Sequence, residues 1–315
     1  ILARTNVGVH FAMNTIVEAR PDTVHWGYFE AARPGVAEIA SGDRVTIRTI
    51  SGAANVTPSD DSAFTVAPEQ RAIHTEVTRQ MLPGHILTGP VAVKGAQPGM
   101  VLEVRIIDIE LGADWGWNII RPGSGALPDD FSEERLFHIA LDKQRQVGTL
   151  PWGQEVPLAP FFGVMGVAPS PDRGTLTSII PGDFGGNMDL KELIPGTILY
   201  LPIFVEGGHF SVGDGHAAQG DGEVCVTAIE TGLNGSFDLI VRDDMHLTMP
   251  RAETPSHHIT MGINPDLDEA ARQALREMIK LICERTERSR EEAYTLCSIC
   301  CDLRVTQLVN QHKGV

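Results

Sequence analysis

The sequence predicts a mostly β protein of sandwich or barrel architecture, with two helices near its C-terminal end. The chain of 315 residues contains 32 glycines and 20 prolines. Up to about residue 250 these turn residues separate short runs in which apolar and polar residues alternate, as they do in strands. Beyond Pro265 the apolar residues instead recur at the spacing of an amphipathic helix.

Three segments support the β part, because each places a glycine turn directly before a run of alternating apolar residues. They span residues 40–49, 96–106 and 193–203, and each is expected to form a strand. Their spacing along the chain is irregular, which excludes a solenoid and indicates a repeated hairpin-like unit of a sandwich or barrel. Internal duplication and chance both stay open as explanations of the likeness.

Two helices are expected near the end of the chain. The first spans residues 266–288, and its apolar face is made by Leu267, Ala270, Ala271, Leu275, Met278, Ile279 and Ile282. The second begins near Arg290, where Ser289 is a candidate N-cap with Glu292 three residues later. Its buried side is expected to consist of Tyr294, Leu296, Cys297, Cys300 and Cys301.

The length of the chain is sufficient to bury a sizeable core, and we expect residues 1–315 to form a single unit. This unit can be subdivided at the changes in pattern. The subdivision gives an N-terminal β part (1–150), a β part that carries the candidate site (151–262) and the C-terminal helices (263–315).

The charge balance limits the classes of partner. The chain has 25 Lys+Arg against 41 Asp+Glu, a formal net charge of -16, so nucleic acids and anionic membranes would be repelled. No window reaches the roughly 18 apolar residues of a membrane span, and residues 1–10 lack the order of a secretion signal. We therefore expect a soluble, cytoplasmic protein with a small-molecule partner, and neither nucleic acid nor membrane.

The cysteines are odd in number, which argues against a disulfide framework; they are Cys225, Cys283, Cys297, Cys300 and Cys301. Cys297 and Cys300 have the CxxC spacing of a metal or redox pair. No second pair and no suitably spaced histidine accompany them, so buried helix cysteines are the favoured interpretation. Cys225 lies in an apolar run and is expected in the core.

The densest polar stretch lies between residues 185 and 230. GGNMD (185–189) precedes a predicted strand over 197–205, and GDGHAAQGDGE (213–223) lies in a predicted long loop before a second strand over 224–230. Side chains two positions apart point the same way on an extended chain. In three pairs of residues the two side chains can therefore converge on one point. The pairs are Asn187 with Asp189, Asp214 with His216, and Asp221 with Glu223.

This mixture of imidazole and carboxylate groups suits Zn²⁺ or another divalent ion that keeps an open position for water. Such an ion would support hydrolysis, because it lowers the pKa of its water and polarises a carbonyl oxygen. The alternative is that Asp and Asn beside glycine only bond their own backbone in turns. The predicted polar loop is longer than the about two to five residues of a plain hairpin, which favours function.

Further candidates carry weaker signals. His85 lies among turn residues and could reach the site across the fold, although a hydrogen-bonded loop position is favoured. His209 could join the metal set or act outside it, and Asp221 is an additional candidate ligand. No GxSxG elbow is present, which disfavours a serine nucleophile.

The residues resemble the acetamidase/formamidase family of amidohydrolases, and the resemblance covers most of the chain in order. It runs through LTGP (87–90), VKGAQPG (93–99), GVMGVAP (163–169), GGNMD, LYLP (199–202), GDGHAAQGDGE, EAY (292–294), LCS (296–298) and CDLRVTQLVN (301–310). It implies sandwich and barrel parts with α/β portions, a homo-oligomer and a divalent metal, commonly zinc. It also implies hydrolysis of formamide, acetamide or related short amides to carboxylate and ammonia.

The working hypothesis places a divalent ion on Asp189, Asp214 and His216. The ion is Zn²⁺ in the first place, with Ca²⁺ or another divalent ion as the alternative. Glu223 is then the general base or a fourth ligand. The hypothesis depends on the paired spacing around one loop.

Asn187 and Gln219 are expected to position the amide substrate. Two other functions stay open at this point. One is a hydrolase of another C–N bond on the same scaffold, in a ureido, guanidino or cyclic amide group. The other is a non-catalytic, metal-stabilised module that binds a small molecule, because a fold alone does not decide function.

Overall fold

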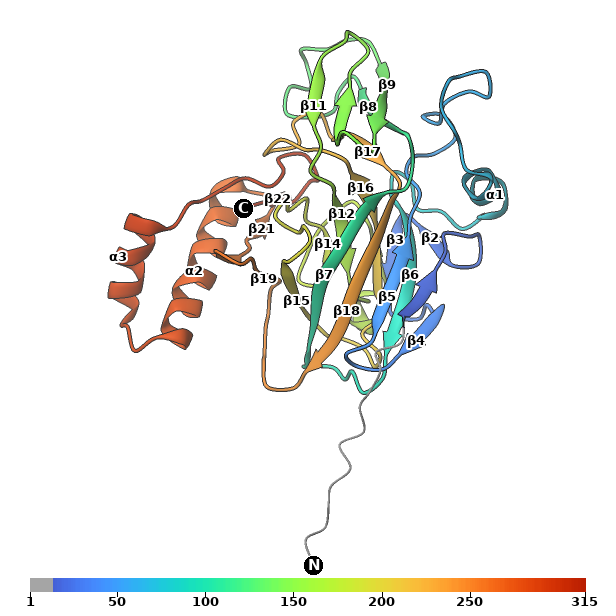
Figure 1. The fold of residues 1–315 in the computed structure, drawn as a ribbon. Coiled ribbons are helices and arrows are strands. Elements are labelled where there is room, and N and C mark those ends of the chain that lie inside the picture. The colour runs from blue at the N-terminus through green and yellow to red at the C-terminus, as the bar shows by residue number, and fades with distance from the viewer. Residues whose placement is uncertain (1–13) are drawn as a thin grey trace, which may run out of the picture.

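The computed structural model describes residues 14–315, so the prediction about residues 1–10 concerns a segment outside the described residues. Strands predominate, as the sequence predicts, and two large sheets form the centre of the molecule (Figure 1). The sheets are open and arranged like a sandwich, and they do not close into a barrel. Two pairings, β1 with β5 and β4 with β6, are parallel.

The first sheet has seven strands in the order β1 (Asn14–Val17), β5 (Arg44–Arg48), β18 (Leu233–Arg242), β7 (Val101–Leu111), β15 (Ile198–Pro202), β19 (Arg251–Glu253) and β20 (His258–Thr260). The three strands predicted after glycine turns are β5, β7 and β15, and all lie in this sheet. β18 pairs with both β5 and β7. Strands from residues 151–262 thus pair with strands from residues 1–150, and the subdivision of the chain stays a prediction.

The second sheet has eleven strands. Its main path is β11 (Glu155–Pro157), β10 (Val147–Thr149), β9 (Arg135–Asp142), β8 (Trp115–Ile120), β17 (Glu230–Thr231), β16 (Phe210–His216), β12 (Phe161–Gly166) and β14 (Gly185–Asn187). A branch joins β6 (Ile86–Val93) to β16, and β2 (Val24–Trp26) and β4 (Ala37–Ile39) pair with β6. β16 is therefore surrounded by other strands.

The main hydrophobic core lies between the two large sheets. Phe237 of β18 contacts Phe162 of β12 and Phe210 of β16, with ring centroids 5.8 Å and 5.6 Å apart. All three side chains are fully buried. Burying one such side chain contributes about 1.5–3 kcal/mol, so these contacts hold β12 and β16 firmly against the other sheet.

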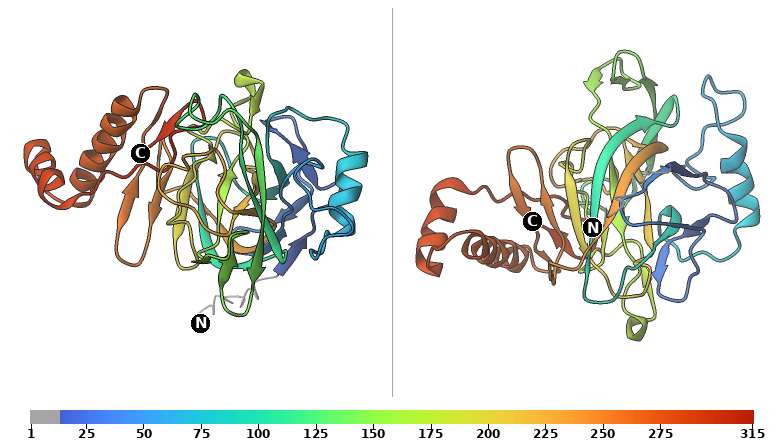
Figure 2. Two further views of the ribbon diagram at one scale, coloured as in Figure 1. Left: turned by 90° about the horizontal axis from the view of Figure 1, so that it is seen from above. Right: turned by 60° about the horizontal axis from the view of Figure 1, so that its bottom comes forward.

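Shorter elements surround the sandwich. β3 (Tyr28–Glu30) pairs with β13 (Thr175–Thr177), β21 (Ile263–Asn264) pairs with β22 (Lys313–Gly314), and Pro171–Arg173 forms a 3₁₀ turn. α1 (Pro68–Glu76) lies on one side of the molecule, and α2 (Leu267–Arg285) and α3 (Arg290–Cys300) lie on the opposite side (Figures 1 and 2). No helix in residues 14–315 combines the length and apolar composition needed to cross a bilayer.

Both predicted C-terminal helices are present, and their starts follow from capping. Asp266 accepts a hydrogen bond from the backbone N–H of Glu269 at the start of α2. The predicted capping box of Ser289 and Glu292 is formed at the start of α3. Each cap satisfies backbone N–H groups that have no partner inside the helix.

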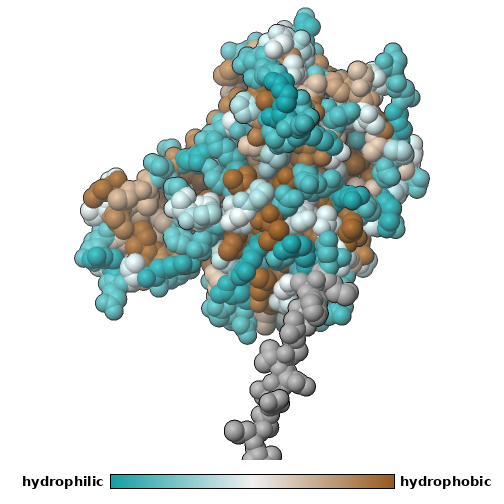
Figure 3. Space-filling view, viewed as in Figure 1, coloured by the Kyte–Doolittle hydropathy of each residue, from teal (hydrophilic) through white to brown (hydrophobic). Residues whose placement is uncertain are grey.

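The buried side predicted for α3 is wrong in large part. The buried residues of α3 are Ala293 and Cys297, whereas Tyr294 is 58% exposed, and Leu296 and Cys300 are exposed as well. The helix has one packed side and leaves its other apolar residues on the surface, where Figure 3 shows hydrophobic colour over this end of the molecule. The favoured interpretation of buried helix cysteines thus holds for Cys297 and not for Cys300.

Candidate active site

The predicted long loop over residues 207–223 contains strand β16, so this part of the prediction is wrong. Every residue of β16 is buried. A Cβ on Gly213 would lie 2.4 Å from the carbonyl oxygen of Ile86, and one on Gly215 would lie 2.5 Å from that of Thr231. These glycines therefore mark close approach of the flanking strands β6 and β17, and not a turn.

The predicted strand over residues 224–230 is also wrong, because only Glu230 and Thr231 form a strand in this region. Residues 217–229 instead form a loop. The side-chain nitrogen of Asn118 lies 2.8 Å from the carbonyl oxygen of Thr227 and 3.0 Å from that of Ala228. Cys225 is half-buried beside Asn118 in this loop, so its predicted place in the core is corrected.

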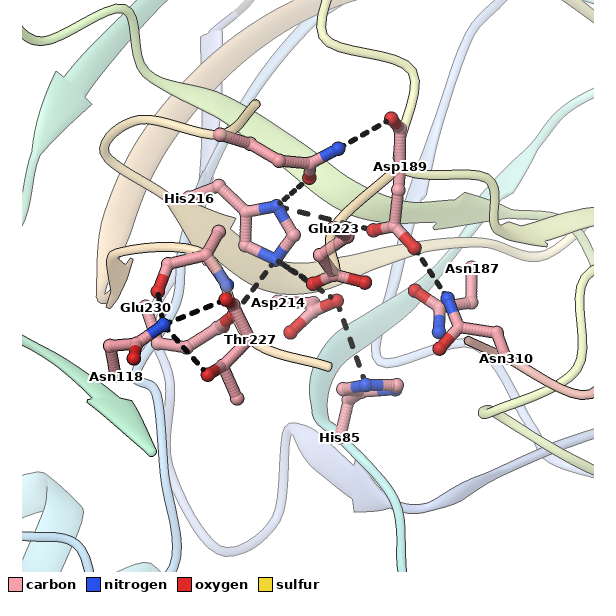
Figure 4. Close-up of polar contacts among 12 residues, drawn as sticks. His85, Asn118, Asn187, Asp189, Asp214, His216, Glu223, Thr227, Glu230 and Asn310 are labelled. Atoms are coloured by element: carbon pink, nitrogen blue, oxygen red, sulfur yellow. Dashed lines mark hydrogen bonds and ion pairs between the residues drawn. The ribbon is translucent and has the colours of Figure 1, made fainter. Parts of the chain in front are cut away.

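His216, at the end of β16, is the centre of a buried cluster of carboxylates (Figure 4). Its Nε2 atom lies 3.2 Å from Glu230 Oε1, 3.4 Å from Asp214 Oδ2 and 3.7 Å from Glu223 Oε1. Asp189 Oδ1 lies 4.0 Å from Nδ1 of the same ring. The structure thus brings together the predicted ligands Asp189, Asp214 and His216 and the predicted base Glu223.

Three of these carboxylates have an unusual backbone conformation. Asp189, Asp214 and Glu223 have φ angles of 50°, 55° and 44°. Left-handed conformations of non-glycine residues cost about 1–3 kcal/mol each and persist where the surrounding structure imposes them. The fold therefore holds these side chains in the cluster against a local preference.

The other predicted residues separate into two groups. Near the cluster, His85 Nε2 lies 3.5 Å from Asp214 Oδ2 while its Nδ1 is 3.0 Å from Ser178 Oγ. Asn187 donates to the carbonyl oxygen of Ile179, and its Oδ1 is buried without a partner. Gln219 lies on the far side of the imidazole, with Oε1 2.8 Å from His216 Nδ1.

Two candidates lie away from the cluster. Asp221 is 42% exposed and pairs with Lys191 at 2.9 Å and Arg304 at 3.1 Å. Its predicted partner Glu223 points inward, so this pair does not converge. His209 precedes β16, at the end of the strand opposite His216, and has no contact with the cluster among the interactions of the described residues.

Sequence reasoning missed two residues of the site. Glu230 is 3% exposed and lies nearest to His216 Nε2, and Asn310 donates a 2.5 Å hydrogen bond to Asp189 Oδ2. Glu230 ends the apolar run VCVTAIE (224–230), and a carboxylate in such a run is a signal of function that could have been used. Asn310 gives no comparable signal, because it is brought to the site only by tertiary structure.

The electrostatics of the cluster reflect a shortage of positive charge. Burial raises the pKa of Asp189 to about 8 and that of Glu230 to about 7, in both cases against the opposing charge of His216. Burial also raises the pKa of Glu223 well above its usual range. These carboxyl groups therefore tend to hold protons in the absence of another cation.

His216 and Asp214 shift in the opposite directions. Burial would lower the pKa of His216, but the carboxylates of Glu230 and Asp214 outweigh burial and the pKa lies well above its ordinary value. Burial would raise the pKa of Asp214, but His85 and His216 hold it well below the ordinary value. Asp214 and His216 thus form the ionised pair of the cluster.

Comparison with known proteins identifies the chain at the level of the family. The sequence model of the family described as "Acetamidase/Formamidase family" matches residues 24–177 and 172–312. The chain belongs to the acetamidase/formamidase family. The resemblance stated from the sequence motifs is thereby confirmed, and so is the prediction of an amidohydrolase.

Individual members of the acetamidase/formamidase family are similar over much of the chain. A formamidase from Methylophilus methylotrophus is 26% identical over 83% of this chain and 78% of its own length. An acetamidase from Mycolicibacterium smegmatis is 28% identical over 57% of each chain. The crystal structure of an acetamidase from Bacillus halodurans is 29% identical and covers 95% of both chains with a TM-score of 0.81.

The site residues fit a divalent cation, which the family resemblance implies. Two sets of donors lie close enough to share an ion, Asp189, His216 and Glu223 in one set and Asp214, His216 and Glu230 in the other. Asp189 Oδ1 and His216 Nε2 are buried without hydrogen-bond partners. Buried polar atoms are rarely left in this state, and a mixture of imidazole and carboxylate donors is typical of zinc sites.

Gly163 provides the space that such an ion requires. A Cβ on this residue would lie 2.6 Å from Asp189 Oδ1, 2.7 Å from Asp214 Oδ2 and 2.8 Å from His216 Cε1. The absence of a side chain therefore leaves a small cradle between three residues of the cluster. One of the atoms that faces the cradle, Asp189 Oδ1, is also one of the buried atoms that lack a partner.

Proposed function

We propose that the protein hydrolyses short linear amides to a carboxylate and ammonia, with a divalent metal ion, Zn²⁺ in the first place, in the buried cluster. The observation that carries the proposal is the convergence of four carboxylates on one imidazole, whose inner nitrogen has no hydrogen-bond partner. Membership of the acetamidase/formamidase family supports amide hydrolysis. The metal and its role rest on the geometry of the cluster.

In this proposal Asp189, Asp214 and His216 hold the ion, as the sequence predicts. His216 belongs to both donor sets, whereas Asp189 and Asp214 belong to one set each, so the ion would lie between the two sets. When bound, the ion would lower the pKa of a water molecule and polarise the amide carbonyl. Glu223 and Glu230 face the same imidazole nitrogen at 3.7 Å and 3.2 Å. We assign to these two residues the roles of fourth ligand and general base.

The general base would take a proton from water as the water oxygen bonds to the amide carbon. The same proton then goes to the leaving nitrogen as the C–N bond breaks, so that ammonia departs. The carboxylic acid loses the second proton of the water to solvent and remains as the carboxylate. Asn187 has a free, buried Oδ1 that can accept a hydrogen bond from the substrate N–H₂ group. His85, whose Nδ1 lies 3.0 Å from Ser178 Oγ, places its Nε2 3.5 Å from Asp214 Oδ2.

The proposal is tested by ammonia release from formamide, acetamide, propionamide, urea and a guanidine, and by ring opening of a small lactam to its amino acid. The protein is assayed as purified, after removal of metal by a chelator, and after addition of Zn²⁺. Release from a linear amide that is lost with the metal and restored by Zn²⁺ is the expected result. Release that persists in metal-free protein contradicts the metal part. Hydrolysis of only urea, the guanidine or the lactam contradicts the substrate class.

Two further predictions from the sequence are kept as proposals. We propose that the protein is cytoplasmic and that it assembles from copies of itself, as the family resemblance implies. Sedimentation of the purified protein measures the second point. A monomer over the working range of concentration would contradict it.

A further inference from the structure

Two carboxamides, the half-buried Gln219 and the buried Asn310, contact the cluster from outside, and each occupies one atom of a proposed metal ligand. Gln219 contacts Nδ1 of His216, and Asn310 contacts Oδ2 of Asp189. The atoms left over are His216 Nε2 and Asp189 Oδ1. These are the same two buried atoms that have no hydrogen-bond partner.

The orientation of the Gln219 amide follows from its other contacts. Its nitrogen donates to the carbonyl oxygens of Asp189 at 3.2 Å and Thr306 at 3.1 Å. The opposite orientation would place an oxygen against two carbonyl oxygens. Gln219 Oε1 must therefore face His216, so that Nδ1 carries the proton and Nε2 is the nitrogen available to a metal ion.

Asn310 acts on Asp189 in an analogous way. Its Nδ2 donates to Asp189 Oδ2 at 2.5 Å, and both side chains are almost completely buried. This bond fixes the plane of the carboxylate. Oδ1 is thereby directed toward the space above Gly163, where a Cβ would lie only 2.6 Å away.

The C-terminal segment, residues 304–315, links the two carboxamides. Thr306 receives the hydrogen bond from Gln219 and donates its own hydroxyl to the carbonyl oxygen of Met188 at 2.8 Å. Gln307 is fully buried and accepts a hydrogen bond from the backbone N–H of Asn310 at 3.0 Å. The backbone of the same segment pairs with Gly222, next to Glu223.

We propose that Gln219 and Asn310 are positioning residues that turn His216 Nε2 and Asp189 Oδ1 toward a bound metal ion, and that the C-terminal segment is thereby part of the active site. This inference rests on the proposed function, because it requires a metal in the cluster. It replaces the predicted role of Gln219 in holding the substrate. Both N–H donors of Gln219 are used by the protein and its Oε1 faces His216 Nδ1, so these contacts with the protein set the orientation of the amide.

Hydrogen bonds of this kind set the orientation and tautomer of metal ligands, and their loss typically reduces metal affinity about 10–100-fold. Gln219→Met and Asn310→Leu keep the approximate side-chain size and remove the hydrogen bond. Gln219→Glu keeps an acceptor for the Nδ1 proton but places its second oxygen against the carbonyl oxygens of Asp189 and Thr306, so its recovery is expected to be partial. We expect weaker metal binding in the first two variants and recovery toward the parent in the third.

The experiment measures the dissociation constant for Zn²⁺ alone, titrated into metal-free protein against a competing chelator. Gln70→Met is the matched control, because Gln70 is a buried carboxamide whose nitrogen donates to Ser51 O at 2.8 Å, in a different part of the molecule. Thermal unfolding of each metal-free variant is recorded in parallel. The control should lose stability like the test variants and keep the parent affinity.

The outcomes separate this proposal from the proposed function. A parent that binds Zn²⁺, with affinity reduced about 10-fold or more in Gln219→Met and partly recovered in Gln219→Glu, supports positioning. Equal affinity in the parent, Gln219→Met and Asn310→Leu overturns positioning and leaves the proposed function standing. A parent that binds no metal overturns both. If Asn310→Leu does not fold, the two Gln219 variants still decide the result.

Discussion

Two histidines of this protein are almost equally buried and have opposite properties. His25 is 2% exposed and His216 is 0% exposed, and they lie near opposite ends of β16. His25 has neutral partners, with Nδ1 2.5 Å from the carbonyl oxygen of Tyr28 and Nε2 3.0 Å from Ser211 Oγ. Burial, aided by Arg33, lowers its pKa to about 3.

The difference shows that burial alone does not identify a functional histidine. His25 is neutral and both of its nitrogens are satisfied, as expected for a structural core residue. His216 is surrounded by carboxylates, which raise its pKa, and its inner nitrogen has no partner. Anionic surroundings together with an unsatisfied atom distinguish a candidate ligand from a packed side chain.

The largest effect is expected from His216→Ala, compared with His25→Ala. Loss of the shared imidazole should abolish both metal retention and amide hydrolysis, because both donor sets contain this residue. His25→Ala should lower stability and leave the metal content of the folded protein intact. Metal analysis and ammonia release measure the two effects. Full activity in His216→Ala would contradict the proposed site.

The next effect concerns the carboxylates around His216. The variants are Glu223→Gln and Glu230→Gln, and we expect one of the two residues to be the general base. In the variant that lacks the base, kcat should fall by about 10²–10⁴-fold with metal retained. In the other variant Zn²⁺ affinity should fall, because a metal ligand is lost. Glu103→Gln is the control, because Glu103 is equally buried but pairs with Arg105. Normal kcat and affinity in both test variants would remove these residues from the mechanism.

A smaller effect is expected from Gly163→Ala. The φ angle of Gly163 lies outside the left-handed region, so the backbone accepts alanine, and the new methyl group would occupy the cradle between Asp189, Asp214 and His216. Displacement of the site by about 1 Å can lower activity about 100-fold. Gly220→Ala adds the same methyl group to open space nearby and should be close to the parent. Equal kcat/KM in the two variants would show that the cradle is not used.

A modest effect on stability is expected at His25. Its folded pKa of about 3 lies below the ordinary 6.5, so between these pH values the unfolded chain binds a proton that the folded chain does not. The free energy of unfolding should therefore fall as pH decreases below about 6.5, by about 1.4 kcal/mol per pH unit from this group. Urea unfolding at pH 7, 6 and 5 should show a shallower decrease in His25→Gln. Identical slopes would contradict the neutral state of His25.

The smallest effect is expected from Asp221→Asn. Asp221 was a candidate ligand in the sequence but pairs with Lys191 and Arg304 at the surface. Exposed ion pairs contribute at most about 1 kcal/mol, so stability should decrease slightly while Zn²⁺ affinity and kcat stay at the parent values. A marked loss of metal would show that Asp221 belongs to the site.

Local patterns predicted much of the fold and part of the site. The glycine turns located β5, β7 and β15, the apolar spacing located α2, and the N-cap Ser289 located the start of α3, because these signals act within a few residues of the chain. The spacing of Asp214 and His216 predicted that they converge, and they lie 3.4 Å apart. The period of an extended chain was sufficient for this inference.

The rest depended on tertiary contacts that local patterns do not contain. The polar and glycine-rich sequence of β16 predicts a loop. In the structure its glycines allow close strand packing and its polar residues face a buried cluster. The apolar run before Glu230 predicts a strand, but the loop is held by Asn118. Asn310 reaches Asp189 from 121 positions away. These features are determined by neighbours distant in sequence.

The residues around the cluster come from stretches that are far apart along the chain, from His85 to Asn310. These residues come together only when the chain from His85 to Asn310 is folded. An ion held there would act as a cross-link with no covalent bond, and its binding energy would add to the stability of the folded state by mass action. Protection against heat or protease by added metal would then report assembly of the whole sandwich, and a metal-starved cell would hold a less durable form of the protein.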